Sequence, residues 1–78
     1  MAKIEIQKIK RIEKQNNRVH LDVRATYTSF TYNGAKYFQI DTYGTINREH
    51  TEKISQSFQI DIESAKALIG LLNKEFGE

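Results

Sequence analysis

The stretch from Arg18 to Thr28 alternates strictly between apolar and polar residues. On one side of an extended chain this places Val19, Leu21, Val23, Ala25 and Tyr27, and on the other His20, Asp22, Arg24, Thr26 and Thr28. A period of two with β-branched and aromatic residues is typical of a strand with one buried face. We therefore predict a strand over about residues 18–32.

Asn33-Gly34 follows this strand and is the strongest short signal for a β-hairpin. A type I′ turn needs positive φ at both central residues, which asparagine and glycine tolerate best. The turn predicts a partner strand over about residues 35–43. Its register pairs Tyr32 with Ala35, Phe30 with Tyr37 and Tyr27 with Ile40, and it puts Phe38 and Ile40 on the face of Val23 and Tyr27.

Two further strands are predicted with weaker patterns. Over about residues 3–13, Ile4, Ile6 and Ile12 share one parity and Ile9 breaks it, which fits an outward Ile9 or a bulge. The spacing of three between Ile6, Ile9 and Ile12 also permits a helix. Gln15-Asn16-Asn17 resembles a turn. The last strand is expected over about residues 53–60, where Ile54, Phe58 and Ile60 fall on one side.

The C-terminal segment predicts a helix over about residues 62–76. Asp61 is a good N-cap, and Glu63 and Lys74 suit the helix dipole at the two ends. Gly77 supplies the stop. One apolar stripe runs along the helix and consists of Ile62, Ala65, Ile69, Leu72 and Phe76, with Leu68 at its edge.

Together these elements predict an α+β fold in a single small domain spanning residues 1–78. About four antiparallel strands form a curved sheet, and the C-terminal helix packs on one face of it. The residues expected to be buried together are Val23, Ala25, Phe38, Ile40, Ile62, Ile69, Leu72 and Phe76.

The length of 78 residues and the absence of cysteine change this picture in one respect. A core of this size stabilises a fold by only about 3–5 kcal/mol, and no disulfide or thiolate metal site can add to it. We therefore predict a homodimer, in which Ala67 and Leu71, off the main helix stripe, contact the second subunit.

Charge is distributed unevenly, although the formal net charge is only +2. Residues 1–24 carry a net charge of +4 and residues 25–78 a net charge of −2. Such asymmetry can mark a surface for nucleic acid, or a solvated sheet edge kept soluble by lysines. The N-terminus alternates charged and apolar residues and no run reaches the length of a membrane span, so a soluble, cytoplasmic protein that binds no membrane is expected.

Catalytic signals are weak, and we predict that the chain is not an enzyme and holds no cofactor or metal. His20 and His50 are far apart in sequence and have no partner at a spacing that suggests a metal site or a triad. Asp22 and Asp41 could share the outer sheet face, but a solvated ion pair with Arg24 explains them better than acid–base catalysis. The four glycines are isolated, so there is no glycine-rich phosphate loop.

Aromatic residues gather on the sheet face that the helix is not expected to cover. The hairpin register sends Phe30, Tyr32, Tyr37 and Tyr43 to that face, beside Arg24. Lys36, Arg48 and Lys53 are expected at its rim. Aromatic rings beside cations are typical of surfaces that bind single-stranded nucleic acid, because bases stack on the rings and phosphates pair with the cations.

Two other interpretations of this face stay open. Tyrosine and arginine are also enriched where proteins bind proteins, so a protein partner or self-association is an alternative. Cross-strand aromatic pairs such as Phe30 and Tyr37 also stabilise exposed hairpins without any ligand.

The segment 37–76 resembles a group of short bacterial and phage or prophage proteins. The shared pattern is QIDTYG, an arginine, K-x-SQ, and an acidic-capped helix that ends in Phe-Gly; here these are Gln39 to Gly44, Arg48, Lys53 to Gln56, and Asp61 to Gly77. The resemblance covers about half the chain and implies a mobile-element setting.

The order of strands followed by one helix is similar to that of the positive-cofactor-four type single-stranded-DNA-binding coactivators, whose curved sheets bind the strand and whose helices help form a dimer. The prediction is therefore a small phage-type protein that binds single-stranded nucleic acid. The alternative is an inhibitor or adaptor that binds a host protein, such as a phage anti-defence protein.

Overall fold

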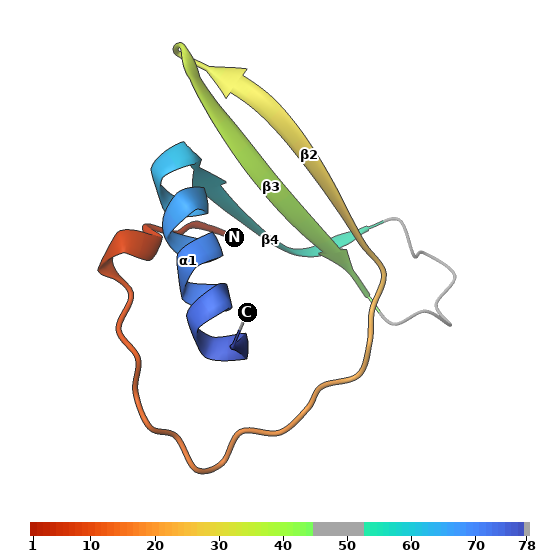
Figure 1. Ribbon diagram of the computed structural model, residues 1–78. Coiled ribbons are helices and arrows are strands. Elements are labelled where there is room, and N and C mark those ends of the chain that lie inside the picture. The colour runs from red at the N-terminus through yellow and green to blue at the C-terminus, as the bar shows by residue number, and fades with distance from the viewer. Residues whose placement is uncertain (45–52, 78) are drawn as a thin grey trace.

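The computed structural model describes residues 1–44 and 53–77, which form an α+β fold (Figure 1). In these residues a four-stranded sheet has the order β1–β4–β3–β2 and is followed by one helix, α1. The elements are β1 (Ala2–Lys3), a short 3-10 helix η1 (Ile6–Lys8), β2 (Ala25–Tyr32), β3 (Ala35–Tyr43), β4 (Ile54–Asp61) and α1 (Ile62–Phe76). The predicted fold class is confirmed.

The β2–β3 hairpin turns at Asn33-Gly34, as predicted. Asn33 has φ 51° and Gly34 has φ 80°, the two positive values that a type I′ turn requires. The ladder pairs Phe30 with Tyr37 and Tyr27 with Ile40, which is the predicted register. A local rule of turn geometry therefore sets which side chains share each face of the sheet.

The rest of the sheet is mixed, whereas an antiparallel sheet was predicted. β3 pairs antiparallel with β4, with Phe38 opposite Ile60, and the register shifts at Thr42/Tyr43. The short β1 pairs parallel with β4 through Ala2 and Lys3. The backbone N–H of Ile4 then donates to the carbonyl of Gln59 over 2.9 Å.

The predicted strand over residues 3–13 is wrong. Only Ala2–Lys3 pairs in the sheet, and the chain then forms η1 because the backbone N–H of Ile6 donates to Ser64 Oγ rather than to a neighbouring strand. The turn predicted at Gln15-Asn16-Asn17 is present at Gln15 and Asn16.

The predicted strand over residues 18–32 begins only at Ala25. The backbone N–H of Tyr43 donates to the carbonyl of Arg24 at the end of the hairpin ladder. Since β3 ends at Tyr43, it offers no backbone for residues 18–23 to pair with. These residues therefore lie in the long connection between η1 and β2 (Figure 1).

The helix begins and ends as predicted. Asp61 is the N-cap and its carboxylate accepts a hydrogen bond from the backbone N–H of Ser64 at 2.9 Å. Glu63 lies in the first turn and Lys74 in the last, which suits the helix dipole. Gly77 ends the helix with φ 79° and donates its N–H to the carbonyl of Asn73.

The predicted core is largely wrong. Phe38 and Ile40 are half-buried on the predicted face, but Val23 and Ala25 are exposed. Four members of the predicted helix stripe are also exposed, namely Ile62, Ile69, Leu72 and Phe76. The physical reason is that α1 turns Ser64 toward the N-terminal segment, and Ala67 and Leu71, one and two turns further along, are half-buried on the same side. Among the described residues the buried apolar side chains are Ile6 and Ile60.

Candidate nucleic-acid interface

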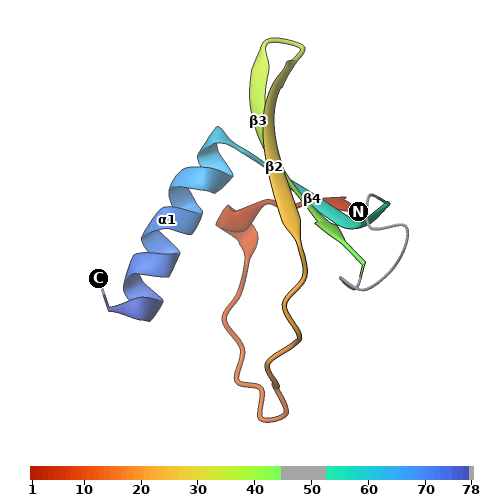
Figure 2. The same cartoon turned by 90° about the vertical axis from the view of Figure 1, so that its right-hand side faces the viewer.

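The sheet has two chemically different faces. Residues directly opposite each other in an antiparallel ladder share a face, so the register assigns every strand residue. The apolar face carries Tyr27, Phe38, Ile40, Phe58 and Ile60. The aromatic face carries Phe30, Tyr32, Tyr37 and Tyr43 together with Thr26, Thr28, Gln39, Asp41, Ser57 and Gln59. Helix α1 stands on the side of the apolar face (Figure 2), so the described part of the chain leaves the aromatic face without a covering helix.

Phe30 and Tyr37 form the first aromatic pair of this face, toward the hairpin turn. Their ring centroids are 5.6 Å apart and the ring planes differ by 26°, which is a stacked arrangement. Tyr32 lies further toward the turn and is 65% exposed. The register thus brings together three of the four predicted aromatic residues in one continuous patch.

Tyr43 forms a second cluster at the opposite end of β3. The guanidinium carbon of Arg24 lies 4.2 Å from the centre of the Tyr43 ring, within the range of a cation–π contact. The Tyr43 hydroxyl also shares a hydrogen bond of 3.0 Å with Thr26 Oγ1. The Thr26 contact holds the tyrosine ring and the cation–π contact holds the guanidinium, so Arg24 and Tyr43 share the face that was predicted for both.

Polar side chains occupy the centre of the aromatic face. Gln59 Nε2 donates to Gln39 Oε1 at 2.7 Å, and Gln39 Nε2 donates to Asp41 Oδ1 at 2.8 Å. Asp41 also accepts a hydrogen bond from Ser57 Oγ and is only 7% exposed. The negative charge of Asp41 is therefore held inside a hydrogen-bonded row rather than presented to a ligand.

Sequence reasoning missed Ser57, Gln59 and Lys3 as parts of this face. Together with Gln39, Ile54, Met1 and Ala2 they line a shallow depression of about 370 Å³. The alternation of Ser57 and Gln59 with Phe58 and Ile60 was the signal that could have placed them there. Lys3 could not have been placed, because its parallel pairing with β4 leaves no pattern in the sequence.

Asp61 lies at the edge of the aromatic face, opposite Tyr37 in the ladder. The hydrogen bond from the Ser64 backbone N–H is the largest influence that holds the pKa of this carboxyl below its usual range. Partial burial acts in the opposite direction, and Lys3 Nζ, 3.9 Å from Asp61 Oδ2, lowers the pKa further. Asp61 is therefore a charged helix cap that also holds Lys3 near the face.

Lys36 does not lie where it was predicted. It pairs with Thr31 and shares the apolar face with Phe38, because neighbouring residues of a strand point to opposite faces and Tyr37 occupies the aromatic one. Lys53 is exposed just before β4, and Arg48 lies outside the described residues.

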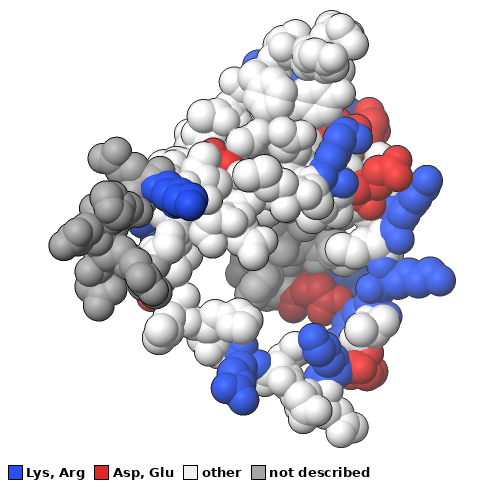
Figure 3. Space-filling model, turned by 180° about the vertical axis from the view of Figure 1, so that it is seen from behind, with Lys and Arg blue, Asp and Glu red and all other residues white. Residues whose placement is uncertain are grey.

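The charged side chains lie mainly around the aromatic face and not across it. Figure 3 shows the side of the molecule that α1 does not occupy, and most of this surface is uncharged. Lys and Arg side chains gather mainly along the edge formed by the N-terminal segment, in which Lys8, Lys10, Arg11, Lys14 and Arg18 are all exposed. The face thus has aromatic clusters at its two ends and a polar row that contains Asp41 between them, and bases outnumber acids along its N-terminal edge. Two of these bases are already paired, Lys8 with Glu5 and Arg11 with Glu13 and Glu75.

Residues 1–44 and 53–77 contain no group of three or more His, Cys, Asp or Glu side chains able to hold a metal ion. In the same part of the chain no helix is both long and apolar enough to cross a membrane. Comparison of the sequence and fold with protein-family models, curated proteins and solved structures gave no match.

Proposed function

We propose that the protein is a small, non-catalytic binding protein that holds single-stranded nucleic acid on its aromatic face. The observation that carries this proposal is the stacked pair of Phe30 and Tyr37 on a sheet face that no described helix covers. Bases stack on such rings whatever their sequence, and each base contributes about 1–3 kcal/mol.

The distance between the two aromatic clusters fits a strand of several nucleotides. Tyr37 and Tyr43 lie six residues apart on β3, which corresponds to roughly 20 Å at about 3.4 Å per residue. Between them, Thr28 and the Gln39–Gln59 pair offer hydroxyl and amide groups to base edges. This supports a site within the range of about 4–16 nucleotides that single-strand-binding sheets occupy.

The charge distribution supports the same ligand. Bases would stack on the aromatic clusters at the two ends of the face, while phosphates would contact Arg24 and the exposed Lys10, Lys14 and Arg18 of the N-terminal segment. Lysines and arginines gather along that edge (Figure 3). The two carboxylates of the face are engaged within the protein, since Asp41 accepts bonds from Gln39 and Ser57 and Asp61 caps α1. Their repulsion toward phosphates is thereby reduced.

The second candidate is an inhibitor or adaptor that binds a host protein. The observation that favours it is the exposed Tyr32 beside the stacked Phe30–Tyr37 pair, since tyrosine-rich surfaces also anchor protein interfaces. The resemblance of residues 37–76 to short phage and prophage proteins suggests a mobile-element setting for either candidate, and the sequence without cysteine fits a cytoplasmic location. In both, we propose that the chain acts as a homodimer.

The deciding experiment is a fluorescence-anisotropy titration with a labelled single-stranded oligonucleotide at several salt concentrations, beside the matching duplex. We expect the single strand to bind more tightly than the duplex, and Tyr37→Ala to weaken it while Tyr37→Phe does not. An affinity weaker than about 10⁻⁴ M that does not respond to Tyr37→Ala would be generic attraction and would favour the protein partner.

A further inference from the structure

A single copy of the chain exposes far more surface than a compact protein of its size. Its accessible surface is 7195 Å², whereas a folded protein of 9.1 kDa exposes about 4,900 Å². The radius of gyration is 14.9 Å, against about 11.5 Å for a compact domain of this length. Roughly 2,300 Å² per copy therefore remains to be covered.

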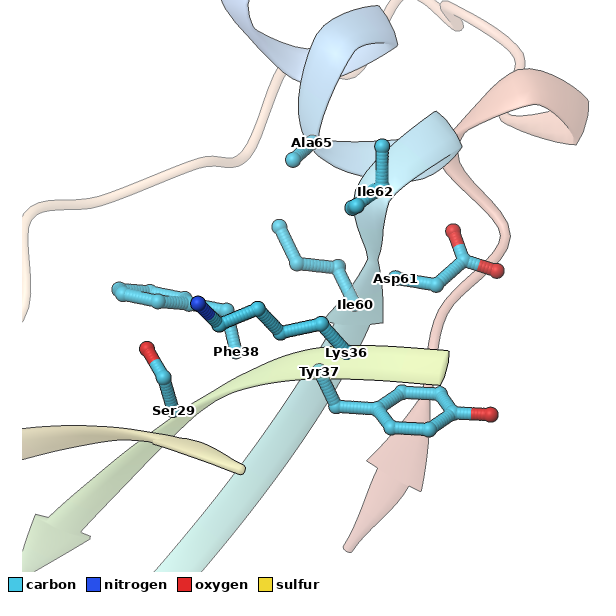
Figure 4. A pocket seen from close by; sticks show the side chains of 8 residues that line it. All are labelled: Ser29, Lys36, Tyr37, Phe38, Ile60, Asp61, Ile62 and Ala65. Carbon is cyan, nitrogen blue, oxygen red and sulfur yellow. The ribbon is translucent and has the colours of Figure 1, made fainter. Parts of the chain in front are cut away.

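Much of this uncovered surface is apolar and belongs to α1. The helix stripe, defined here as Ile62, Ala65, Ile69, Leu72 and Phe76, contains four exposed residues, with Ile69 at 61% and Phe76 at 77%. Ile62 and Ala65 begin the stripe and line a pocket of about 130 Å³ with Phe38 and Ile60 of the apolar face (Figure 4). The pocket thus joins the helix stripe to the apolar face of the sheet.

A second uncovered element lies in the same chain. The exchange segment, defined here as residues 18–23, alternates apolar and polar residues like a half-buried strand. Val19 is nevertheless 97% exposed and Leu21 86%. The segment loops away from both the helix and the sheet (Figures 1 and 2). One chain therefore contains a segment with strand-like alternation that no sheet buries. It also contains an apolar surface, made by the helix stripe and the apolar face, that no other element covers.

We infer that two copies of the chain exchange residues 18–23, so that Val19, Leu21 and Val23 of each copy cover the helix stripe and apolar face of the other. A two-fold exchange closes on itself, because each copy gives and receives the same segment. A foreign partner seated on the helix stripe would leave Val19 and Leu21 exposed. The inference rests on the proposed homodimer, and it replaces Ala67 and Leu71 as its expected contact, since both are half-buried toward η1.

The uncovered area fits a second copy. Covering roughly 2,300 Å² on each copy buries about 4,600 Å² in total, which falls within the range of about 2,000–5,000 Å² or more that obligate homodimers bury in total.

Crosslinking tests the exchange, because the natural chain has no cysteine. A Leu21→Cys copy is mixed in denaturant with a mass-tagged Leu72→Cys copy, refolded, and treated with a short flexible bis-maleimide. Before crosslinking, we expect a native mass twice that of one chain. After crosslinking, we expect the Leu21→Cys and Leu72→Cys copies to form a covalent product in several-fold higher yield than Asp22→Cys and Leu72→Cys copies do. Asp22→Cys is the control because it has the opposite parity in the alternation of the segment.

Three other outcomes would contradict the exchange, and one of them would also contradict the homodimer. A monomer in which only the Leu21→Cys/Leu72→Cys double variant crosslinks, within one chain, would overturn both the exchange and the homodimer. A dimer with that same crosslink inside each chain would overturn the exchange alone. A dimer in which Leu21→Cys and Asp22→Cys give equal yields would also overturn it. Oligonucleotide titration of the same variants reports separately on the proposed ligand.

Discussion

The backbone N–H of Ile6 donates a hydrogen bond of 3.0 Å to the hydroxyl of Ser64, which ties the start of the chain to α1. Ser64 is completely buried. Its hydroxyl also lies 3.1 Å from the carbonyl of Ile4 and 2.7 Å from Oε1 of Gln7, and its single proton serves one of them at a time. This one polar side chain fixes which side of the helix faces the N-terminal segment.

Replacing this hydroxyl is expected to destabilise the fold. Ser64→Ala leaves the buried N–H of Ile6 without an acceptor, which should lower the free energy of unfolding by about 1–3 kcal/mol. Urea denaturation followed by circular dichroism measures the change. Ser55→Ala, at an exposed position of β4, is the matched control and should change the stability by less than about 0.5 kcal/mol. Equal losses in both variants would contradict the anchoring role of Ser64.

Acid should weaken the cap of α1 through Asp61. The hydrogen bond from the Ser64 backbone, followed by the charge of Lys3, makes the pKa of Asp61 lower in the folded state than in the unfolded state. The folded chain therefore binds fewer protons, and the contribution to stability is complete above the unfolded pKa of about 3.9. It is lost as the pH falls through the lower, folded pKa.

Asp61→Asn isolates this titration, because asparagine caps a helix without carrying a charge. The melting temperature of the natural chain should fall more steeply between about pH 5 and pH 2 than that of the variant. Thermal melts at a series of pH values measure both slopes. Parallel curves would mean that the Asp61 carboxylate adds nothing to the stability of the cap.

Local rules predicted the hairpin turn, its register, the second hairpin strand and the helix, whereas the first hairpin strand begins seven residues later than predicted. Asn33-Gly34 fixes the turn, the turn fixes the register, and the register brought Phe30 beside Tyr37 as expected. The cap at Asp61 and the stop at Gly77 likewise depend on neighbouring residues only. The same reasoning should have excluded Lys36 from the aromatic face, because it directly precedes Tyr37 on the strand.

Long-range contacts were not predictable in the same way. The apolar stripe of α1 indicates a buried side but does not identify what buries it, and the described chain turns Ser64 inward instead. The alternation of residues 18–23 predicted a strand that the structure does not contain, because β3 ends at Tyr43 and is too short to pair with them. Both errors concern apolar positions that a single copy leaves uncovered.

Removing rings from the aromatic face should weaken single-strand binding without unfolding the protein. Phe30→Ala and Tyr37→Ala are each expected to cost about 1–3 kcal/mol of binding free energy, because a stacked base is lost. Tyr37→Phe keeps the ring and should bind like the natural chain. Anisotropy titrations at one fixed salt concentration measure all three, with circular dichroism to verify the fold. Equal affinities for Tyr37→Ala and Tyr37→Phe would exclude stacking on this ring.

Two cations on opposite faces should differ in their effect on the salt dependence of binding. Arg24 lies over Tyr43 on the aromatic face, so Arg24→Ala should lower the slope of log affinity against log salt by about 0.7, the share of one phosphate contact on a single strand. Arg24→Lys keeps the charge and should preserve the slope while losing some affinity, because lysine does not stack as a planar group.

Lys36 lies on the apolar face, so Lys36→Ala should leave the slope unchanged although it removes the same charge. Titrations from about 50 to 200 mM salt measure the three slopes. If Lys36→Ala lowered the salt slope as much as Arg24→Ala, the phosphates would be attracted by the net charge of the protein as a whole. That result would contradict binding on the aromatic face.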